Sequence, residues 1–347
     1  MNKDGAEKNT SRDKLAGFNI RSVLADTNLV TLFFIMAASF ILMSALNPAR
    51  YLTGRNFQSM AFQFPEIGLM SIAVMIAMLM GGIDLSVVGI ANLSTIVGAY
   101  AMIAAEPIFG PHAATGIGIV TSLIIGTICG ALNGALIAWV GIPAILTTLG
   151  TKEIFIGIAV FITGGPAVFG LPAPFAFIGS GTIGFIPVPA LIFAVTVAIY
   201  QILLQHRKFG LELYLMGTNR KAAKFTGILT EFTIVKAHML GGFIGSMGGI
   251  IMSSRAISAK SDYGTSYIIM SILVAVLGGV NPFGGFGKVM GVVMAILTIQ
   301  FLASGFNVLR IDAYFRIFIW GALLVAMLLI NYYGNKLSEK KQIKAMQ

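Results

Sequence analysis

Long apolar runs recur along the whole chain and leave little room for any fold other than a bundle of membrane-spanning helices. A helix that crosses the hydrocarbon core of a bilayer needs about 20 consecutive apolar residues, and several runs here reach that length. Only 10% of the 347 residues are charged, against about 25% in a soluble domain. The sequence therefore predicts an all-α, polytopic membrane protein.

We expect about ten transmembrane helices between two polar tails. The tails cover residues 1–26 and 334–347, and the membrane domain covers residues 27–333. Ten spans put about 16 Lys and Arg residues on the side of the tails and about 6 on the other, which predicts that both termini are cytoplasmic. The predicted spans are residues 27–46, 65–80, 87–105, 114–140, 144–163, 190–204, 232–253, 266–280, 289–304 and 314–331.

The same composition argues against several other classes of protein. The net charge of +10 comes from basic residues in separated clusters beside apolar runs, which is typical of topology signals and not of a nucleic-acid surface. The single cysteine, Cys129, excludes a disulfide framework, and no paired carboxylates, nucleophile–base pair or metal-ligand motif emerges. The glycine-rich run 284–288 lacks the spacing and the Ser or Thr of a phosphate-binding loop. We therefore expect no enzymatic activity, metal or cofactor in this chain.

Residues 206–231 form the longest polar segment in the interior of the chain. The sequence predicts a short helix within it, with Asn219 as the N-cap, Ala222 and Ala223 inside, and Gly227 at the stop. Two interpretations are open at this point. The segment is either a solvated loop whose positive charge fixes the topology, or a docking helix for a cytoplasmic partner.

Charged side chains next to or inside the predicted spans need an explanation at two places. Asp84 lies in the run GGIDLS, residues 81–86, where it either caps the next helix or lies at a gate. Lys152 and Glu153 are expected just inside the span 144–163. They are either structural, paired with each other or with neighbouring helices or reaching the membrane interface, or they contact a polar pathway.

Two glycine-rich stretches have a structural interpretation. Glycines at positions 126, 130 and 134 form a stripe along one predicted helix, which favours close packing against a neighbour. Residues 164–189 are rich in Gly, Pro and Phe and are long for a structureless loop, so we expect an external cap or a re-entrant segment.

Four fragments together resemble one family of membrane proteins. They are GGIDLS at 81–86, NGALIAWVGIPAILTTLGT at 133–151, MGTNRKAAKFTGI at 216–228 and LGGVNPFGGFGKVMG at 277–291. They look like the permease subunits of bacterial ABC importers for ribose, xylose, galactose and related sugars, and autoinducer-2 permeases share them. The resemblance covers residues 63–332. After TLGT the family often has Met or Ser, whereas this chain has Lys152-Glu153.

The resemblance implies the permease subunit of an ABC importer in the bacterial cytoplasmic (inner) membrane, which forms the translocation path for a small sugar or sugar-like solute. Such a permease is embedded in membrane lipid and works as a pair, with a second copy or a paralogue. A separate ABC ATPase uses the ATP on the cytoplasmic face, and a periplasmic or lipid-anchored solute-binding protein delivers the solute.

Site residues follow from the resemblance and from predicted positions. The loop 206–231 resembles the coupling helix that enters a groove on the ATPase. The residues expected to couple to the ATPase are Gly217, Asn219, Arg220, Lys221, Ala222, Ala223 and Gly227. From their predicted positions alone, the residues expected at the translocation path or gate are Gly81, Gly82, Asp84, Ser86, Asn92, Asn133 and Thr148.

An ion-gradient-driven secondary transporter is the alternative hypothesis. It requires a membrane-embedded carboxylate or histidine coupled to transport, and inverted repeats between the halves of the chain. Asp84 is the candidate carboxylate, and no convincing repeat is visible.

Overall fold

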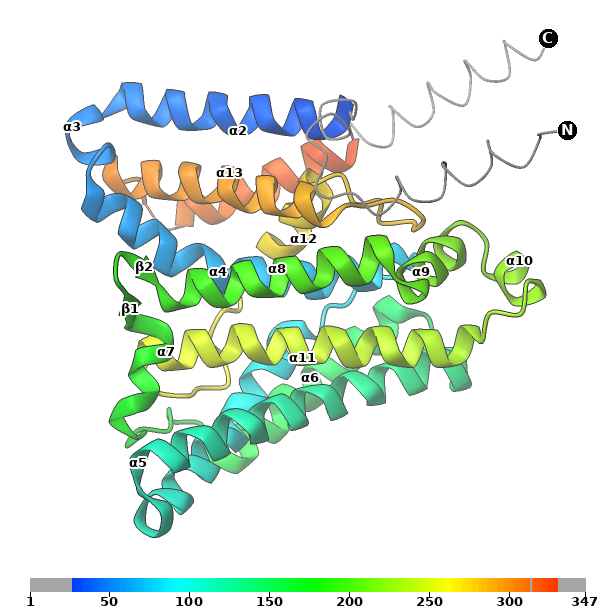
Figure 1. The fold of residues 1–347 in the computed structure, drawn as a ribbon, viewed down its shortest axis with the longest axis horizontal. Coiled ribbons are helices and arrows are strands. Elements are labelled where there is room, and N and C mark those ends of the chain that lie inside the picture. Colours follow the sequence, from blue (N-terminus) through cyan, green and yellow to red (C-terminus); the bar gives the residue numbers. More distant parts are fainter. Residues whose placement is uncertain (1–26, 313, 330–347) are drawn as a thin grey trace, which may run out of the picture.

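Long helices lying side by side make up most of the computed structural model, which describes residues 27–312 and 314–329 (Figure 1). Within this described part, seven helices are long and apolar enough to cross a membrane, and two shorter helices are also apolar. One of the seven folds back on itself. Counting its two arms separately and adding the two shorter helices gives ten apolar segments, as predicted.

The elements follow one another in this order. They are α2 (Thr27–Leu46), α3 (Pro48–Tyr51), α4 (Gly54–Leu79), α5 (Val87–Ala135), the π-helix η2 (Leu136–Val140), α6 (Ala144–Thr163), the 3-10 helix η3 (Ala173–Phe175), α7 (Ala176–Ser180), β1 (Thr182–Ile183), β2 (Ile186–Pro187), α8 (Val188–His206), α9 (Lys208–Thr218), α10 (Arg220–Phe225), α11 (Thr230–Ala256), α12 (Tyr267–Leu277), α13 (Val289–Val308) and a last helix, Tyr314–Leu329.

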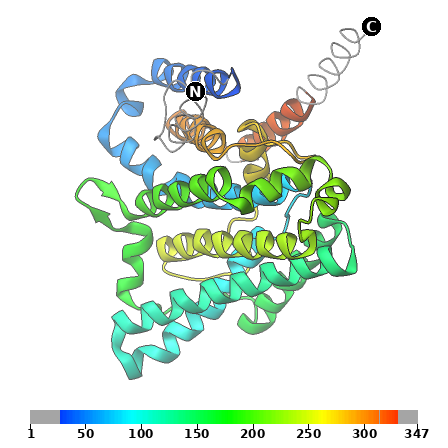
Figure 2. The same ribbon diagram turned by 45° about the vertical axis from the view of Figure 1, so that its right-hand side comes forward.

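The helix α5 consists of two antiparallel arms that meet at Gly110. A straight helix of 49 residues would be roughly 74 Å long, more than twice the roughly 30 Å thickness of a hydrocarbon core. Gly110 has a φ of 77° and a ψ of 169°, a non-helical conformation that glycine tolerates because it has no Cβ. The arms pack closely, since a Cβ on Gly98 would lie 2.6 Å from the carbonyl oxygen of Gly118. Figure 2 shows the reversal between the cyan and teal arms.

The predicted glycine stripe packs against α11. Gly126, Gly130 and Gly134 in the second arm of α5 all face this helix. A Cβ on Gly130 would lie 2.1 Å from the carbonyl oxygen of His238, so the two backbones are nearly in contact. The stripe is therefore confirmed as a close-packing surface.

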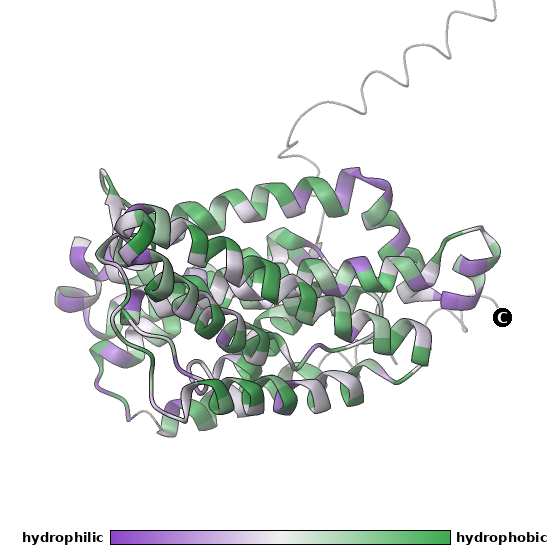
Figure 3. Ribbon diagram, turned by 90° about the horizontal axis from the view of Figure 1, so that it is seen from below, coloured by the Kyte–Doolittle hydropathy of each residue, from purple (hydrophilic) through white to green (hydrophobic). Residues whose placement is uncertain are grey.

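The two ends of the bundle carry different structures (Figure 1). The helices α9 and α10 lie at one end, together with the beginning of α2 and the end of the last helix. At the other end, η3, α7 and the β1–β2 hairpin cover the bundle, and Val168 exchanges two backbone hydrogen bonds with Ala259. Residues 164–189 thus form a cap, as expected. Figure 3 shows hydrophobic residues along the helices and many of the hydrophilic residues towards the two ends.

Several helix boundaries differ from the predictions. The helix α4 begins at Gly54 and not at residue 65, because Thr53 caps it by accepting a hydrogen bond from the N–H of Asn56 at 3.2 Å. The helix α12 has 11 residues and was predicted as a full span; at 1.5 Å per residue it covers roughly half of a bilayer core. It stops early because Gly279 adopts a φ of 81° and turns the chain. The expected turn between the third and fourth spans is reduced to the kink of α5.

Candidate functional site

The short helix predicted within residues 206–231 is present as α10. The Asn219 Oδ1 accepts a hydrogen bond from the N–H of Ala222 at 3.0 Å, and Gly227 ends the turn with a φ of 85°. Ala223 is buried against the bundle, whereas Phe225 is 93% exposed. Lys221 and Phe225 lie on the opposite surface, and the exposed Arg220 lies at its edge; we call these three residues the outer face of α10.

Two other parts of the chain pack against α9, the helix directly before α10. A Cβ on Gly217, at the end of α9, would lie 2.0 Å from the carbonyl oxygen of Leu79 and 2.3 Å from the amide nitrogen of Gly285. Tyr214 donates a hydrogen bond to the carbonyl oxygen of Gly287 at 2.6 Å. Burial raises the pKa of the Tyr214 phenol, which keeps it protonated as a donor. The loop after α12, the end of α4 and the α9–α10 segment therefore form one packed unit.

Three of the predicted gate residues form a connected hydrogen-bond network, and a fourth, Thr148, binds the backbone of the same turn. The Asp84 carboxylate accepts from the N–H and the hydroxyl of Ser86, at 2.8 and 2.6 Å. The Ser86 hydroxyl oxygen accepts from the Asn133 amide at 2.7 Å, and the Thr148 hydroxyl oxygen accepts from the N–H of Leu85 at 3.1 Å. The side chains of Asp84, Ser86, Asn133 and Thr148 are all buried. In this conformation the network is a closed junction between α5, α6 and the GGIDLS turn.

Two glycines of the same turn line a small cavity. Gly81 has a φ of 83°, and Gly82 donates to the carbonyl oxygen of Ala77 at 3.1 Å. Together they border a cavity of about 170 Å³ that also reaches Arg220 on α10 and the buried His238. The predicted coupling and gate regions therefore adjoin each other.

Asn92 lies apart from the other predicted gate residues. Its amide donates to the carbonyl oxygens of Ser261 and Tyr263, at 2.8 and 2.9 Å. These bonds hold α5 to the loop that follows α11. The structure thus does not bring Asn92 together with Asp84.

Lys152 and Glu153 lie in the middle of α6 and not at its beginning. Glu153 is the tenth of the 20 residues of the helix, and its side chain is 65% exposed. The ammonium of Lys152 lies 2.8 Å from the Glu153 carboxylate. The expected position near a span end is therefore wrong, because the helix extends a similar length on either side of the pair.

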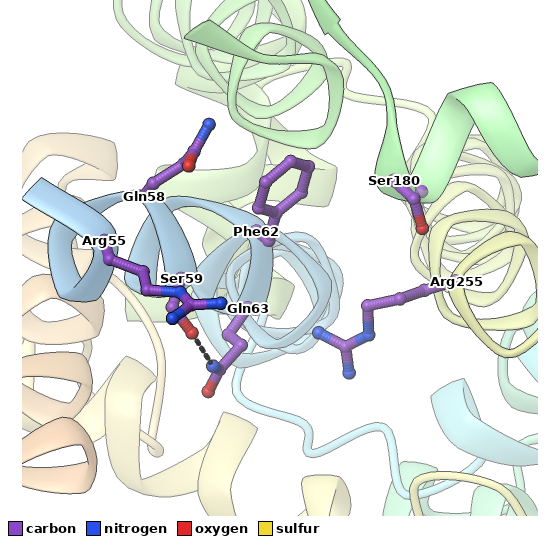
Figure 4. A pocket seen from close by; sticks show the side chains of 8 residues that line it. Arg55, Gln58, Ser59, Phe62, Gln63, Ser180 and Arg255 are labelled. Atoms are coloured by element: carbon purple, nitrogen blue, oxygen red, sulfur yellow. Dashed lines mark hydrogen bonds between the residues drawn. The ribbon is translucent and has the colours of Figure 1, made fainter. Parts of the chain in front are cut away.

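A cavity at the capped end contains residues that the sequence did not single out. It has a volume of about 530 Å³, and we call it the cap-side cavity. Figure 4 shows its walls. The lining residues are Arg55, Gln58, Ser59, Phe62, Gln63, Gly179, Ser180 and Arg255.

One buried ion pair lies beside this cavity. The Arg255 guanidinium donates to the fully buried Glu66 carboxylate at 3.0 Å, and the Tyr267 hydroxyl donates to the same oxygen at 3.2 Å. Glu66 is thus a buried carboxylate inside the membrane domain, as Asp84 is. The sequence did contain a signal for it, because Glu66 lies inside a predicted apolar span.

Comparison with known proteins identifies the kind of molecule to which this arrangement belongs. Residues 56–328 match the family described as branched-chain amino acid transport system / permease component. The chain belongs to this family. It is similar to the D-allose transport system permease protein AlsC of Escherichia coli, with 31% identity over 88% of this chain and 91% of the relative. It is also similar to the ribose import permease protein RbsC of Haemophilus influenzae, with 29% identity over 94% and 99% of the two chains.

A third relative is the autoinducer 2 import system permease protein LsrD of Klebsiella pneumoniae, with 28% identity over 86% of this chain and 89% of the relative. No solved structure matches the chain.

Family membership settles the coarse function. The chain is a multi-pass permease subunit of an ABC importer in the inner membrane, and it is not catalytic by itself. An importer of this kind also contains an ATPase and a solute-binding protein. The resemblance drawn from the four sequence fragments is confirmed, and an ion-gradient-driven secondary transporter is not favoured.

Proposed function

We propose that this permease carries a small sugar or sugar-like solute along a path beside the exposed face of α6, between two copies of the chain. The relatives named for D-allose, ribose and autoinducer 2 support this class of solute. We take the second permease to be an identical chain or a paralogue embedded beside it in the lipid bilayer.

The main observation in support of this path is the exposed side chain of Glu153 in the middle of an apolar helix. A charged side chain at the centre of a bilayer costs about 2.5–3.5 kcal/mol on insertion scales, so such residues face protein or water. The side chain of Glu153 is 65% exposed in the single chain. A water-containing path closed by a second copy gives this carboxylate a polar environment, which the lipid would not.

The proposal extends to the gate residues at one end of α6. Thr148 belongs to this helix and bonds both to the N–H of Leu85 and to the carbonyl oxygen of Ile83, at 3.1 Å each. A shift of α6 therefore acts on the GGIDLS turn. This connection supports Gly81, Gly82, Asp84, Ser86, Asn133 and Thr148 as a gate; Asn92 would act only through the loop that follows α11.

We further propose that the ATPase docks on the outer face of α10. The predicted coupling residues in 217–227 include most of an exposed helix with three cationic side chains, one of which (Lys224) is paired with Glu231, and one aromatic side chain. A groove on a partner protein can bind such a surface. In this proposal the α10 end is cytoplasmic, the membrane domain covers residues 27–333, and the two tails, which lie outside the described residues, are on the same side.

Measurement of solute uptake tests whether the path runs beside α6. The complete transporter is placed in proteoliposomes with its solute-binding protein, and ATP-dependent uptake of D-ribose and D-allose is measured. The double variant Lys152→Ala/Glu153→Ala is expected to lower the uptake rate several-fold. The control is Lys260→Ala/Asp262→Ala, which removes an exposed pair with the same 2.8 Å separation from the capped end.

Native protein that takes up neither sugar would refute the solute class, and unchanged uptake by the α6 variant would refute the path.

Co-purification tests the docking face. The variant Arg220→Glu/Lys221→Glu should lose the ATPase during purification from mild detergent, whereas Arg50→Glu, an exposed arginine on α3, should keep it. Retention of the ATPase by both variants would contradict docking on α10.

A further inference from the structure

The two walls of the cap-side cavity come from different parts of the chain. The first turns of α4 contribute one wall, and α7 with the last turn of α11 contributes the other. Figure 4 shows Arg55, Ser59 and Gln63 on one side, with Ser180 and Arg255 across from them. The volume of about 530 Å³ lies within the range of about 300–1,000 Å³ that is usual for small-molecule sites.

Arg255 is held in position by a buried carboxylate. Its guanidinium is bonded to Glu66, which is fully buried and also accepts from Tyr267. A guanidinium has five N–H donors, one of which donates to Glu66, and the side chain also interacts with Tyr267. The side chain of Arg255 is 34% exposed, so part of its donor set can reach a molecule in the cavity.

The neutral polar groups of the cavity can both donate and accept. The Gln63 amide donates to the Ser59 hydroxyl at 2.8 Å, which leaves its carbonyl oxygen and its second N–H for a ligand. Gln58 and Ser180 add an amide and a hydroxyl. Phe62 supplies an apolar ring between them (Figure 4). A hydroxyl group donates one hydrogen bond and accepts two, so several neighbouring hydroxyls match this set.

Arg255 also borders a second cavity. This space of about 270 Å³ is lined by Met252, Tyr263 and Tyr267, among others. Arg255 therefore borders both cavities, and its bond to Glu66 holds its guanidinium in place.

We propose that the cap-side cavity is a binding site for a small, neutral, polyhydroxylated solute, in which Arg255, Gln63 and Phe62 make the main contacts. The proposal rests on the proposed function, because it assigns to the permease a site where the solute binds before it enters the path. Arg55 forms no ion pair with the other described residues. A negatively charged sugar acid is therefore the competing ligand that the experiment must distinguish.

Protection of an introduced thiol tests the site. Ser180→Cys places a thiol at the cavity wall, while the native Cys129 is buried. The complete transporter carrying this change is labelled with a small thiol reagent in the presence of D-ribose, D-allose or the corresponding sugar acids. We expect the neutral sugars to slow labelling several-fold, and we expect this protection to disappear when Gln63→Leu is added.

Two controls make the result specific. Ser266→Cys, an exposed serine at the same end but outside the cavity lining, should be labelled at the same rate with and without sugar. Gln205→Leu, an exposed glutamine of α8, should leave the protection of the Ser180→Cys thiol intact.

The other possible results of the labelling and uptake measurements each refute a different part of the proposal. Protection by sugar acids alone would refute the neutral ligand class, and no protection by any compound would refute the site. Transport of these sugars by native protein without protection would leave the proposed function standing and refute only this inference. Absence of ATP-dependent sugar uptake by native protein would instead refute the proposed function.

Discussion

The contact between α5 and α11 gives the sharpest test of the packing. In the Gly130→Ala variant the new Cβ would lie 2.1 Å from the carbonyl oxygen of His238, against 3.4 Å for the shortest ordinary contact. The two helices would have to separate by roughly 1 Å, and close-packed interiors resist such displacements. At the flanking Gly126 and Gly134 an added Cβ would lie 2.5 and 2.6 Å from atoms of α11, so the backbones are close along the whole stripe and leave little room for a local tilt.

The expected change in the free energy of unfolding of the Gly130→Ala variant is the difference between two opposing effects. Overpacking a closed interface costs about 1–3 kcal/mol. Alanine in place of glycine in a helix returns about 0.5–1 kcal/mol. Gly130→Ala should therefore lower the free energy of unfolding by about 1–2 kcal/mol.

Thermal unfolding of the purified permease in one detergent checks this value. The matched control is Gly116→Ala, the same change in the same arm of α5 at an exposed position with no atom within 4 Å of the new Cβ. We expect a lower apparent Tm for the Gly130 variant and an equal or higher Tm for the Gly116 variant. If both variants unfold at the native temperature, the argument from backbone contact is wrong.

Three further substitutions test the contacts that join α9 and α10 to the end of α4 and to the GGIDLS turn. Gly217→Ala should push the end of α9 away from Leu79 and reduce solute uptake per ATP hydrolysed, measured in proteoliposomes, and an unchanged ratio would contradict this. Asn219→Ala removes the N-cap and should cost α10 about 0.5–2 kcal/mol, which a titration with the ATPase would detect as weaker binding. Asn133→Leu leaves the buried Ser86 hydroxyl without its amide donor and should lower the stability by about 1–3 kcal/mol in thermal unfolding; a native Tm would argue against it.

Local signals explain why some parts of the fold were predictable from the sequence. The helix α6 begins and ends where predicted, because Pro143 precedes it and Gly164, with a φ of 68°, follows it. The N-cap of α10 was predictable for the same reason, since Asn219 acts on a residue three positions away. Such signals need only the chain next to them.

Contacts between distant residues set the limit of prediction. Glu66 and Arg255 are 189 positions apart, and neither the apolar periodicity nor the charge count shows that they pair. The position of Lys152-Glu153 was misjudged for a different reason. The sequence favoured a position at the membrane interface, because a charged side chain in lipid is costly. A polar path lowers that cost, but it is formed together with neighbours outside the single chain and is therefore not visible in the sequence.

The contacts at the α10 end also suggest how a movement of the docking helix could reach the path. Gly217 touches the end of α4, so α9 and α10 cannot approach the bundle without displacing Leu79 and the GGIDLS turn behind it. This turn is bonded in two places to Thr148 of α6. Because closely packed elements transmit a shift and do not absorb it, we infer that pressure on α10 moves α6, the helix that carries the exposed Glu153. The glycines serve this transmission by bringing the backbones into contact without flexible side chains between them.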